Sequence, residues 1–443
     1  MDGRPTPSGS RKARDHVDEG ARRRLAAILG GSAGNLVEWY DWFAYASFSL
    51  YFAKVFFPSG AEIDQRLQAA GVFAIGFLAR PLGAWVMGIF ADRHGRKSAL
   101  VVSVSMMCLG SLIVALAPGY QTIGGFAPAI LIVARLIQGL SVGGEYGASA
   151  TYMSEMAGRE RRGFWSSFQF VTLIAGQIAA LGVLIVLQRL LTPAQLNGWG
   201  WRVPFLIGAV LAVVVWWIQT GLEETASFRA EAVAGDPRGS TTMLLFTRYR
   251  RETAMIFVLT GAGSLAFYCF TTYMQKFLTG TAHYSKSVAT DISAASLVIF
   301  LLIQPLFGWL GDKIGRRALL AFAFGGGALT TWPILSAIAA SHAPVLALAL
   351  VCAALFILAG YTAVNAVVKS ELFPTRVRAL GVALPYALAN AIFGGTAELL
   401  AETFKKAGME SGFYIYVSLV LAVGCAVAFA MRDTQKTSLI MEG

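Results

Sequence analysis

Long apolar segments, separated by short polar ones, constrain this chain more than any other feature of its sequence. A helix needs about 20 apolar residues to cross the hydrocarbon core of a bilayer. Twelve segments meet that need, which predicts an all-α membrane protein with twelve transmembrane helices. Only 14% of the residues are charged, against about 25% in soluble proteins. The expected spans are 25–53, 67–91, 97–117, 127–152, 164–188, 202–220, 252–278, 289–311, 317–340, 345–369, 378–403 and 411–431.

The segment 88–100 recurs in similar form as segment 308–320, each time between two apolar runs. In each copy a Gly stands four residues before an Asp, and a basic cluster follows. Glu155 and Glu371 form a second repeated feature, because an Arg follows each of them seven residues later. Repeats at so long a period predict two halves with the same plan, as alternating access requires.

The polar segments predict the domain organisation and the orientation in the membrane. With both termini in the cytoplasm, most of the 36 Lys and Arg residues lie on the cytoplasmic side, as the positive-inside rule requires. The net charge of +11 is then a topology signal, and we expect no nucleic-acid partner. We expect a monomer in the lipid bilayer of a bacterial inner membrane. The expected parts are a cytoplasmic tail (1–24), a six-helix bundle (25–220), a cytoplasmic linker (221–251), a second six-helix bundle (252–431) and a cytoplasmic tail (432–443).

Several segments resemble a known group of transporters. The repeated segments resemble the loop signatures of the major facilitator superfamily. Within it, the metabolite:proton symporter family is similar at GNLVEWYD (34–41), FLARPLG (77–83), GLSVGGEYG (139–147), LEET (222–225) and ELFPTRVR (371–378). The resemblance implies proton-coupled import of a small organic anion by alternating access, with the dicarboxylate α-ketoglutarate as the expected substrate. The signature of the related sugar porters after span six is absent, so we expect no sugar substrate.

Charged side chains inside a span are costly unless they face a cavity or a partner. Glu38 and Asp41 lie three residues apart in the first span, and therefore on one helix face. Two carboxylates close together in apolar surroundings disfavour each other's charge, so one of them can hold and release a proton. The resemblance favours Asp41 and implies Arg135 as its partner. The alternative is that these carboxylates form a permanent ion pair with Arg135 or Arg80. Glu145 and Glu398 are further candidates for carrying the proton.

Arg80, in the second span, is the first candidate for binding a substrate carboxylate, because a guanidinium is always charged and donates two parallel hydrogen bonds. Its alternative role is to pair with Glu38 or Asp41. Amides, a hydroxyl and one ammonium group supply further donors, for which hydrogen bonds between helices are the alternative. Lys276 alternatively reaches the outer interface. These further candidates are Gln169, Gln177, Lys276, Gln304, Asn365, Tyr386 and Asn390.

The repeated segments predict a gate at the cytoplasmic side. Their Gly residues allow close backbone approach, and their Asp residues can accept hydrogen bonds from helix N-termini of the other half. Their Arg residues can pair with the repeated Glu residues. The alternative is a basic topology anchor. The expected gate residues are Gly88, Asp92, Arg96, Glu155, Arg162, Gly308, Asp312, Arg316, Glu371 and Arg378.

Other classes of protein have less support in the sequence. It lacks the motifs of nucleotide hydrolysis and of zinc peptidases, and its four cysteines lie in separate spans, so we expect no enzyme, cofactor or metal. Symport of citrate, shikimate, or a zwitterion such as proline or betaine stays open as an alternative. The short carboxyl-terminal tail disfavours an osmosensing zwitterion carrier. A membrane receptor that does not transport is the alternative from a different class.

Overall fold

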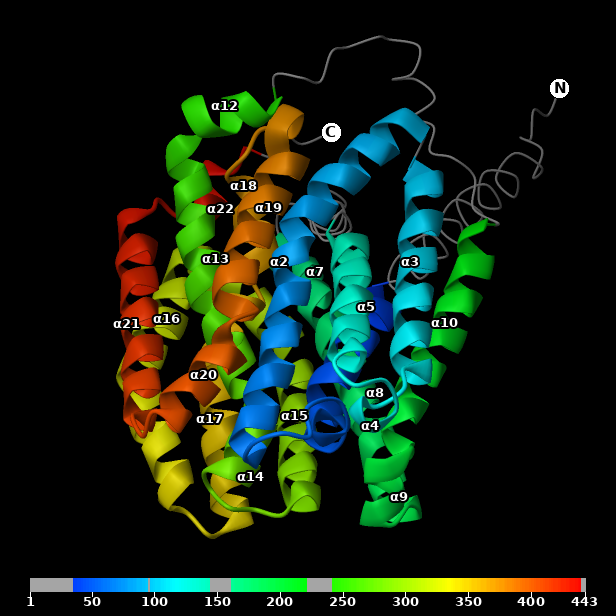
Figure 1. The fold of residues 1–443 in the computed structure, drawn as a ribbon. Coiled ribbons are helices and arrows are strands. Elements are labelled where there is room, and N and C mark those ends of the chain that lie inside the picture. Colours follow the sequence, from blue (N-terminus) through cyan, green and yellow to red (C-terminus); the bar gives the residue numbers. More distant parts are fainter. Residues whose placement is uncertain (1–34, 95, 144–160, 221–240, 440–443) are drawn as a thin grey trace, which may run out of the picture.

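The computed structural model describes residues 35–94, 96–143, 161–220 and 241–439, and over these residues the chain is almost entirely helical (Figure 1). The first helix is described over 35–56. The other long helices of the N-terminal half, up to residue 220, are α2 (Glu62–His94), α3 (Arg96–Leu116), α5 (Phe126–Val142), α8 (Phe168–Leu190) and α10 (Val203–Thr220). Short helices join them, namely α4 (Tyr120–Ile123), α7 (Arg162–Ser166), α9 (Pro193–Gly198) and η2 (Gly200–Arg202).

The C-terminal half, from residue 241, contains helices that are more often interrupted. Its long helices are α13 (Arg250–Phe270), α15 (Lys286–Ile314), α16 (Arg316–Ala340), α17 (Pro344–Thr362), α19 (Thr375–Ala389) and α21 (Glu410–Ala430). Shorter ones are α12 (Thr241–Thr247), α14 (Met274–Gly280), α18 (Asn365–Glu371), the π-helical η4 (Asn390–Gly394), α20 (Ala397–Lys406) and α22 (Thr434–Thr437).

These helices confirm the expected twelve spans. In the described residues, nine helical segments are long and apolar enough to cross a membrane, and two shorter apolar helices cover Val101–Leu116 and Phe126–Val142. The helix over 35–56 is the twelfth. The structure differs from the expectation in two details. Spans seven, ten and eleven are each interrupted within their expected ranges, and residues 241–247, which we expected in the linker, form a helix. Local backbone hydrogen bonds span two of these breaks, from Tyr273 N to Tyr268 O at 2.8 Å and from Val364 N to Tyr361 O at 3.2 Å.

Helices within each half pack mainly against one another, and the halves meet along two seams. One seam joins α2 to α19, η4 and α20, and the other joins α15 to α7 and α8. We call the end where α15 passes into α16, which carries the second repeated segment, the motif end. The opposite end, with α4, α9 and α14, is the far end (Figure 1).

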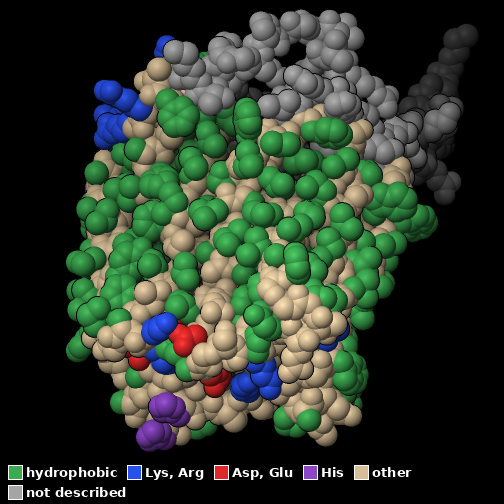
Figure 2. Space-filling model, in the orientation of Figure 1, with side chains coloured by type: hydrophobic (Ala, Val, Ile, Leu, Met, Phe, Trp, Pro, Cys, Tyr) green, Lys and Arg blue, Asp and Glu red, His purple; other side chains and the backbone are tan. Residues whose placement is uncertain are grey.

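The outer surface of the bundle is apolar at the level of the spans. Figure 2 shows hydrophobic side chains over the middle of one face, with charged side chains gathered toward the ends. Large apolar side chains that are exposed in the absence of lipid include Trp85, Val186, Trp217, Leu302, Leu329 and Leu419. Such a belt matches a bilayer rather than water, so the chain is a multi-pass membrane protein.

Candidate substrate and proton site

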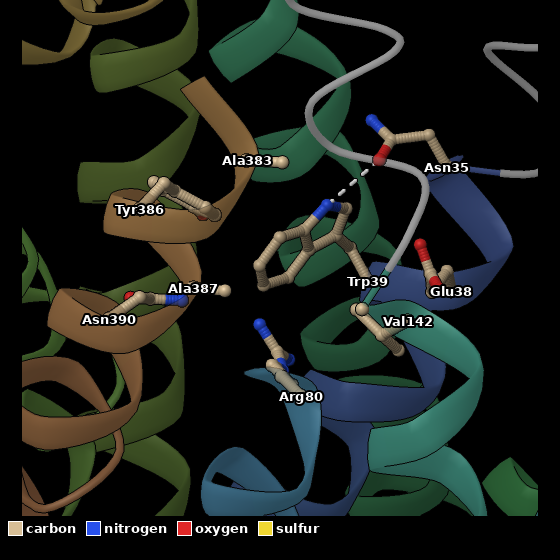
Figure 3. Close-up of a pocket in the computed structure, with 10 residues that line it drawn as sticks. Asn35, Glu38, Trp39, Arg80, Val142, Ala383, Tyr386, Ala387 and Asn390 are labelled. Carbon is tan, nitrogen blue, oxygen red and sulfur yellow. Dashed lines mark hydrogen bonds between the residues drawn. The ribbon is translucent and has the colours of Figure 1, made fainter. Parts of the chain in front are cut away.

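A small cavity lies between the two halves and is lined from both of them (Figure 3). The helix over 35–56, α2 and α5 supply its N-terminal wall, while α19 and η4 supply the other. A site shared by two halves changes shape when they move against each other, as alternating access requires. The lining residues are Asn35, Glu38, Trp39, Arg80, Val142, Gly143, Ala383, Tyr386, Ala387 and Asn390.

Arg80 carries a buried positive charge into this cavity. Its side chain is enclosed by aromatic rings, with the guanidinium carbon 4.0 Å from the ring centroids of both Trp42 and Phe77. Trp39, at 5.0 Å, completes the enclosure. Nε and Nη2 of Arg80 donate no hydrogen bond to any described residue. Buried charges are normally paired and hydrogen-bonded, so this guanidinium is suited to an anion from outside the protein.

The other polar groups of the cavity lie on both sides of Arg80. Trp39 Nε1 donates a 3.0 Å hydrogen bond to Asn35 Oδ1, which fixes one wall. Glu38 also faces the cavity and interacts electrostatically with Arg80. Across the cavity, Tyr386 packs against Lys369, whose buried Nζ lies 4.2 Å from the ring centroid. A second cation therefore stands behind the C-terminal wall.

Asp41 lies in a separate hydrogen-bonded network inside the N-terminal half. Ser111 Oγ donates to its Oδ1 and Gln138 Nε2 to its Oδ2, each at 2.5 Å. The same Gln138 accepts a 2.7 Å hydrogen bond from Arg135 Nη1 through Oε1. Arg135 itself stays 3.9 Å from the carboxylate. All four side chains are buried, so Asp41 has a complete set of partners without direct contact to its cation.

Trp42 connects this network to the cavity. Its ring centroid lies 4.0 Å from the guanidinium carbon of Arg80 and 3.9 Å from that of Arg135. Cation–π contacts of this kind hold a guanidinium in place without using its hydrogen-bond donors. A change in the charge of Asp41 can therefore affect Arg80, in the cavity, through the ring of Trp42.

The other expected substrate residues lie away from the lining of the cavity. Gln304 is used within the C-terminal half, where it accepts from Thr362 Oγ1 at 2.9 Å and donates to Phe300 O at 3.2 Å. Gln169 and Gln177 of α8 and Asn365 of α18 are buried elsewhere in the bundle. Their contact with substrate stays a prediction.

Lys276 does not reach the outer interface, and that alternative was wrong. The side chain is buried and forms an ion pair with Glu398 of α20. The physical reason is the carboxylate, because a buried partner replaces the water that an interfacial Lys would seek. A role of Lys276 in substrate binding stays a prediction.

Comparison with known proteins identifies the architecture. The family described as Sugar (and other) transporter matches residues 27–236 and 223–441. The chain belongs to this transporter family. It is 53% identical over 418 residues to the alpha-ketoglutarate permease of Escherichia coli K12, covering 94% of this chain and 95% of that protein. It is 33% identical to the citrate-proton symporter of Klebsiella pneumoniae, covering 84% and 83%.

Solved structures confirm the major facilitator fold. The xylose transporter XylE from E. coli, in a partially occluded inward open conformation, superposes with a TM-score of 0.72. The match covers 92% of this chain and 97% of XylE at 19% identity, which supports the fold alone. The family match and the relatives confirm the transporter class that the residues predicted.

At the motif end of this transporter, Asp312 of α15 contacts the N-terminus of α7 in the other half. Its Oδ1 accepts from Gly163 N at 2.8 Å and its Oδ2 from Phe164 N at 2.9 Å. Arg316 Nη2 holds the same carboxylate at 2.8 Å, and its Nε lies 3.7 Å from Glu371 Oε2. A carboxylate at a helix N-terminus is favourable, so the bonds from Gly163 and Phe164 to Asp312 join the halves, as a gate would require. The contacts of Arg316 lie within the C-terminal half.

Close backbone packing accompanies this contact. A Cβ added to Gly308 would lie 2.5 Å from Gly163 O, so only Gly fits there. The structure describes fewer of the matching residues in the first repeat. Gly88 lies in α2, whereas the side chains of Asp92 and Arg96, and all of Glu155, lie outside the described residues.

The carboxyl-terminal segment 433–439 lies across the motif end. Gln435 Nε2 donates to Asp312 O at 2.8 Å, and Leu439 N donates to Glu371 O at 3.0 Å. Arg378 Nη2 donates to Leu439 O at 3.0 Å, and Arg162 Nη1 lies 3.3 Å from Ser438 Oγ. Arg162 belongs to the N-terminal half, so this segment also joins the two halves.

The sequence reasoning missed three residues that the structure brings to the site. Gln138 had a usable signal, because it follows Arg135 by three residues and so shares its helix face. Lys369 is the last residue of the expected span 345–369, and the structure buries it. Ser111 had no signal, since a Ser in a span is usually bonded to its own helix.

Proposed function

We propose that this protein imports α-ketoglutarate together with protons across a bacterial inner membrane. It acts as a monomer by alternating access, and both termini and the motif end face the cytoplasm. The observation that carries the proposal is Arg80, a buried guanidinium on a cavity shared by both halves, whose Nε and Nη2 donate to none of the described residues. The 53% identity to a protein named for α-ketoglutarate supports the choice of substrate.

The roles follow from the chemistry of a dicarboxylate. Arg80 binds one carboxylate through Nε and Nη2, and Lys369 attracts the second toward the C-terminal wall. Asn390 and Tyr386 supply an amide and a hydroxyl for the keto oxygen or a carboxylate oxygen. Substrate then contacts both halves at once, which favours their joint closure around it.

Asp41 carries a proton, with Arg135 and Gln138 as its partners and Glu38 as a second carboxylate beside the cavity. Protonation of Asp41 removes one buried negative charge, and Arg135 keeps its hydrogen bond to Gln138 Oε1. The charge change reaches Arg80 through Trp42. Proton binding and anion binding are therefore coupled inside one apolar region, where charges interact strongly. Asp312, Arg316 and Glu371 act as the cytoplasmic gate.

Uptake of radiolabelled α-ketoglutarate by proteoliposomes tests the proposal. An inward proton gradient should drive accumulation, and unlabelled α-ketoglutarate should compete better than citrate, shikimate, proline or betaine. Equal competition by proline or betaine would reject the dicarboxylate site. Binding without accumulation would make the protein a receptor.

A further inference from the structure

The structure holds a second buried carboxylate–cation pair that the proposed function leaves unused. Lys276 of α14 and Glu398 of α20 form an ion pair in which both side chains are almost completely buried. Glu398 Oε2 accepts no hydrogen bond from any described residue. Burying an ion pair costs free energy that mutual attraction only partly returns, so such a pair is weak as a stabilising device. Inside a transporter it calls for another role.

The position of Glu398 gives it access to the far end. Glu402 follows one helical turn later on the same face of α20, also buried, and its Oε2 accepts no hydrogen bond from the described residues. The last turn of α20 reaches water, because the side chain of Lys406 is 52% exposed and pairs with Asp64 of α2 at 2.6 Å. Glu402 and Glu398 thus lie in succession along α20, from the side of the far-end surface into the bundle.

The charged and titratable groups around these two carboxylates come from several neighbouring helices. Glu402 interacts electrostatically with Arg66 of α2, with Lys276 and with Lys405. Tyr273 interacts with Glu402 and with Glu410 of α21. Tyr45, from the helix over 35–56, interacts with Glu398 on one side and with Arg135 on the other. The charges of Arg135, in the Asp41 network, and of Glu398 therefore both act on this one aromatic side chain.

The backbone connects the same carboxylate to the cavity. Asn390 lines the cavity and begins the π-helical η4, which leads into α20 and Glu398. π-Helical turns interrupt the regular hydrogen bonding of a helix and are frequent at functional sites. Because α20 packs against α2 of the other half, movement of the halves changes the surroundings of Glu398.

We propose that Glu398 is a second proton-binding carboxylate, loaded from the far end through Glu402, with Lys276 as its counter-ion. One proton from water adds to a Glu398 oxygen, and the same proton leaves that oxygen to the other side after the halves move. Lys276 stays charged throughout. This inference rests on the proposed function.

The test counts the protons that enter with each substrate. Proteoliposomes with an internal pH dye take up radiolabelled α-ketoglutarate, and the ratio of protons to substrate is measured for wild type, Glu398→Gln and Asp291→Asn. Asp291 is exposed on α15 and undergoes the same change of charge. We expect a lower ratio only for Glu398→Gln, with exchange of labelled for unlabelled substrate retained. An unchanged ratio in Glu398→Gln would overturn the inference, whereas a ratio of zero in wild type would overturn the proposed function instead.

A second variant covers the case in which Glu398→Gln fails to fold because Lys276 is left unpaired. The double variant Glu398→Gln/Lys276→Gln removes both charges, and its thermal unfolding in detergent should match wild type. It should show the same lowered ratio with exchange retained. A folded double variant that has the wild-type ratio would contradict the role of Glu398. One that has lost exchange would assign Lys276 to the substrate and contradict its role as a counter-ion.

Discussion

Asp41 and Arg135 form an ion pair that Gln138 bridges. Their closest atoms, Oδ2 and Nη1, lie 3.9 Å apart, while Gln138 contacts each of them within 2.7 Å. Because Arg135 also donates a hydrogen bond to Gln138, Asp41 can accept a proton without leaving the guanidinium without a partner. A direct bidentate pair would hold the carboxylate in its charged form more firmly. The bridged arrangement suits a carboxylate that must change its charge in every transport cycle.

Replacement of Asp41 by Asn should separate exchange from accumulation. The amide keeps the shape of the side chain but cannot take up a proton. We expect accumulation of α-ketoglutarate under a proton gradient to fall to the level without a gradient, while exchange of substrate persists. Ser111→Ala is the matched control, because it removes one of the hydrogen bonds to Asp41, about 1 kcal/mol, and leaves the carboxylate in place. Gradient-driven accumulation by Asp41→Asn would show that the proton is carried elsewhere.

Replacement of Arg80 by Lys should weaken substrate binding although the charge is kept. An ammonium cannot donate the two parallel hydrogen bonds of a guanidinium. The loss of a charge-assisted hydrogen bond costs about 2 kcal/mol, roughly 30-fold in the KM for uptake. Arg202→Lys is the control, since Arg202 binds backbone carbonyls of Gly198 and Ala117 at the far end. A KM for Arg80→Lys equal to that of wild type would remove Arg80 from the site.

Replacement of Asp312 by Asn should open the motif end more often. The substitution removes a negative charge from the N-terminus of α7, an effect of about 1 kcal/mol, or roughly fivefold in population. The readout is maleimide labelling of a cysteine at position 167, because the Ser167 side chain packs against Gly308 when the halves are joined. Faster labelling is expected. Labelling at the rate of the parent protein would mean that Asp312 does not hold the gate.

Removal of residues 433–443 should act in the same direction as the change at Asp312. The deletion eliminates the hydrogen bonds to Asp312 O and Glu371 O and the contact with Arg162. We expect faster labelling at position 167 with uptake retained. Leu439→Ala, which keeps the backbone bonds of the segment, serves as the control. Unchanged labelling after the deletion would show that this segment does not join the halves.

The sequence predicts the number and class of the spans well, because hydrophobic length alone decides which segments can cross a membrane. It does not predict where spans break. The interruption at 271–273 contains no Gly or Pro, and the π-helical η4 packs against α2 of the other half. Segment 241–247 lies in the expected linker but forms α12, whose Leu245 packs against Phe373 and Val377.

The candidate site is predictable in part. Charged residues within spans are rare, so Asp41, Arg80 and Arg135 are recognisable from their positions. Which of these side chains contact one another depends on the rotation of each helix about its axis, and the sequence does not reveal that rotation. The spacing of Glu38 and Asp41 places both on one face, yet the structure directs Glu38 to the cavity and Asp41 to Gln138. Lys369 lies near a loop in sequence, and only packing against Tyr386 brings it inside.

Coupling of proton and anion movement is the central claim, and an imposed substrate gradient tests it most directly. Proteoliposomes with equal internal and external pH receive external α-ketoglutarate, and an internal dye reports the pH. The account predicts that the interior acidifies as labelled substrate enters, and that Asp41→Asn reduces this acidification. Entry of α-ketoglutarate with no change in internal pH would contradict it.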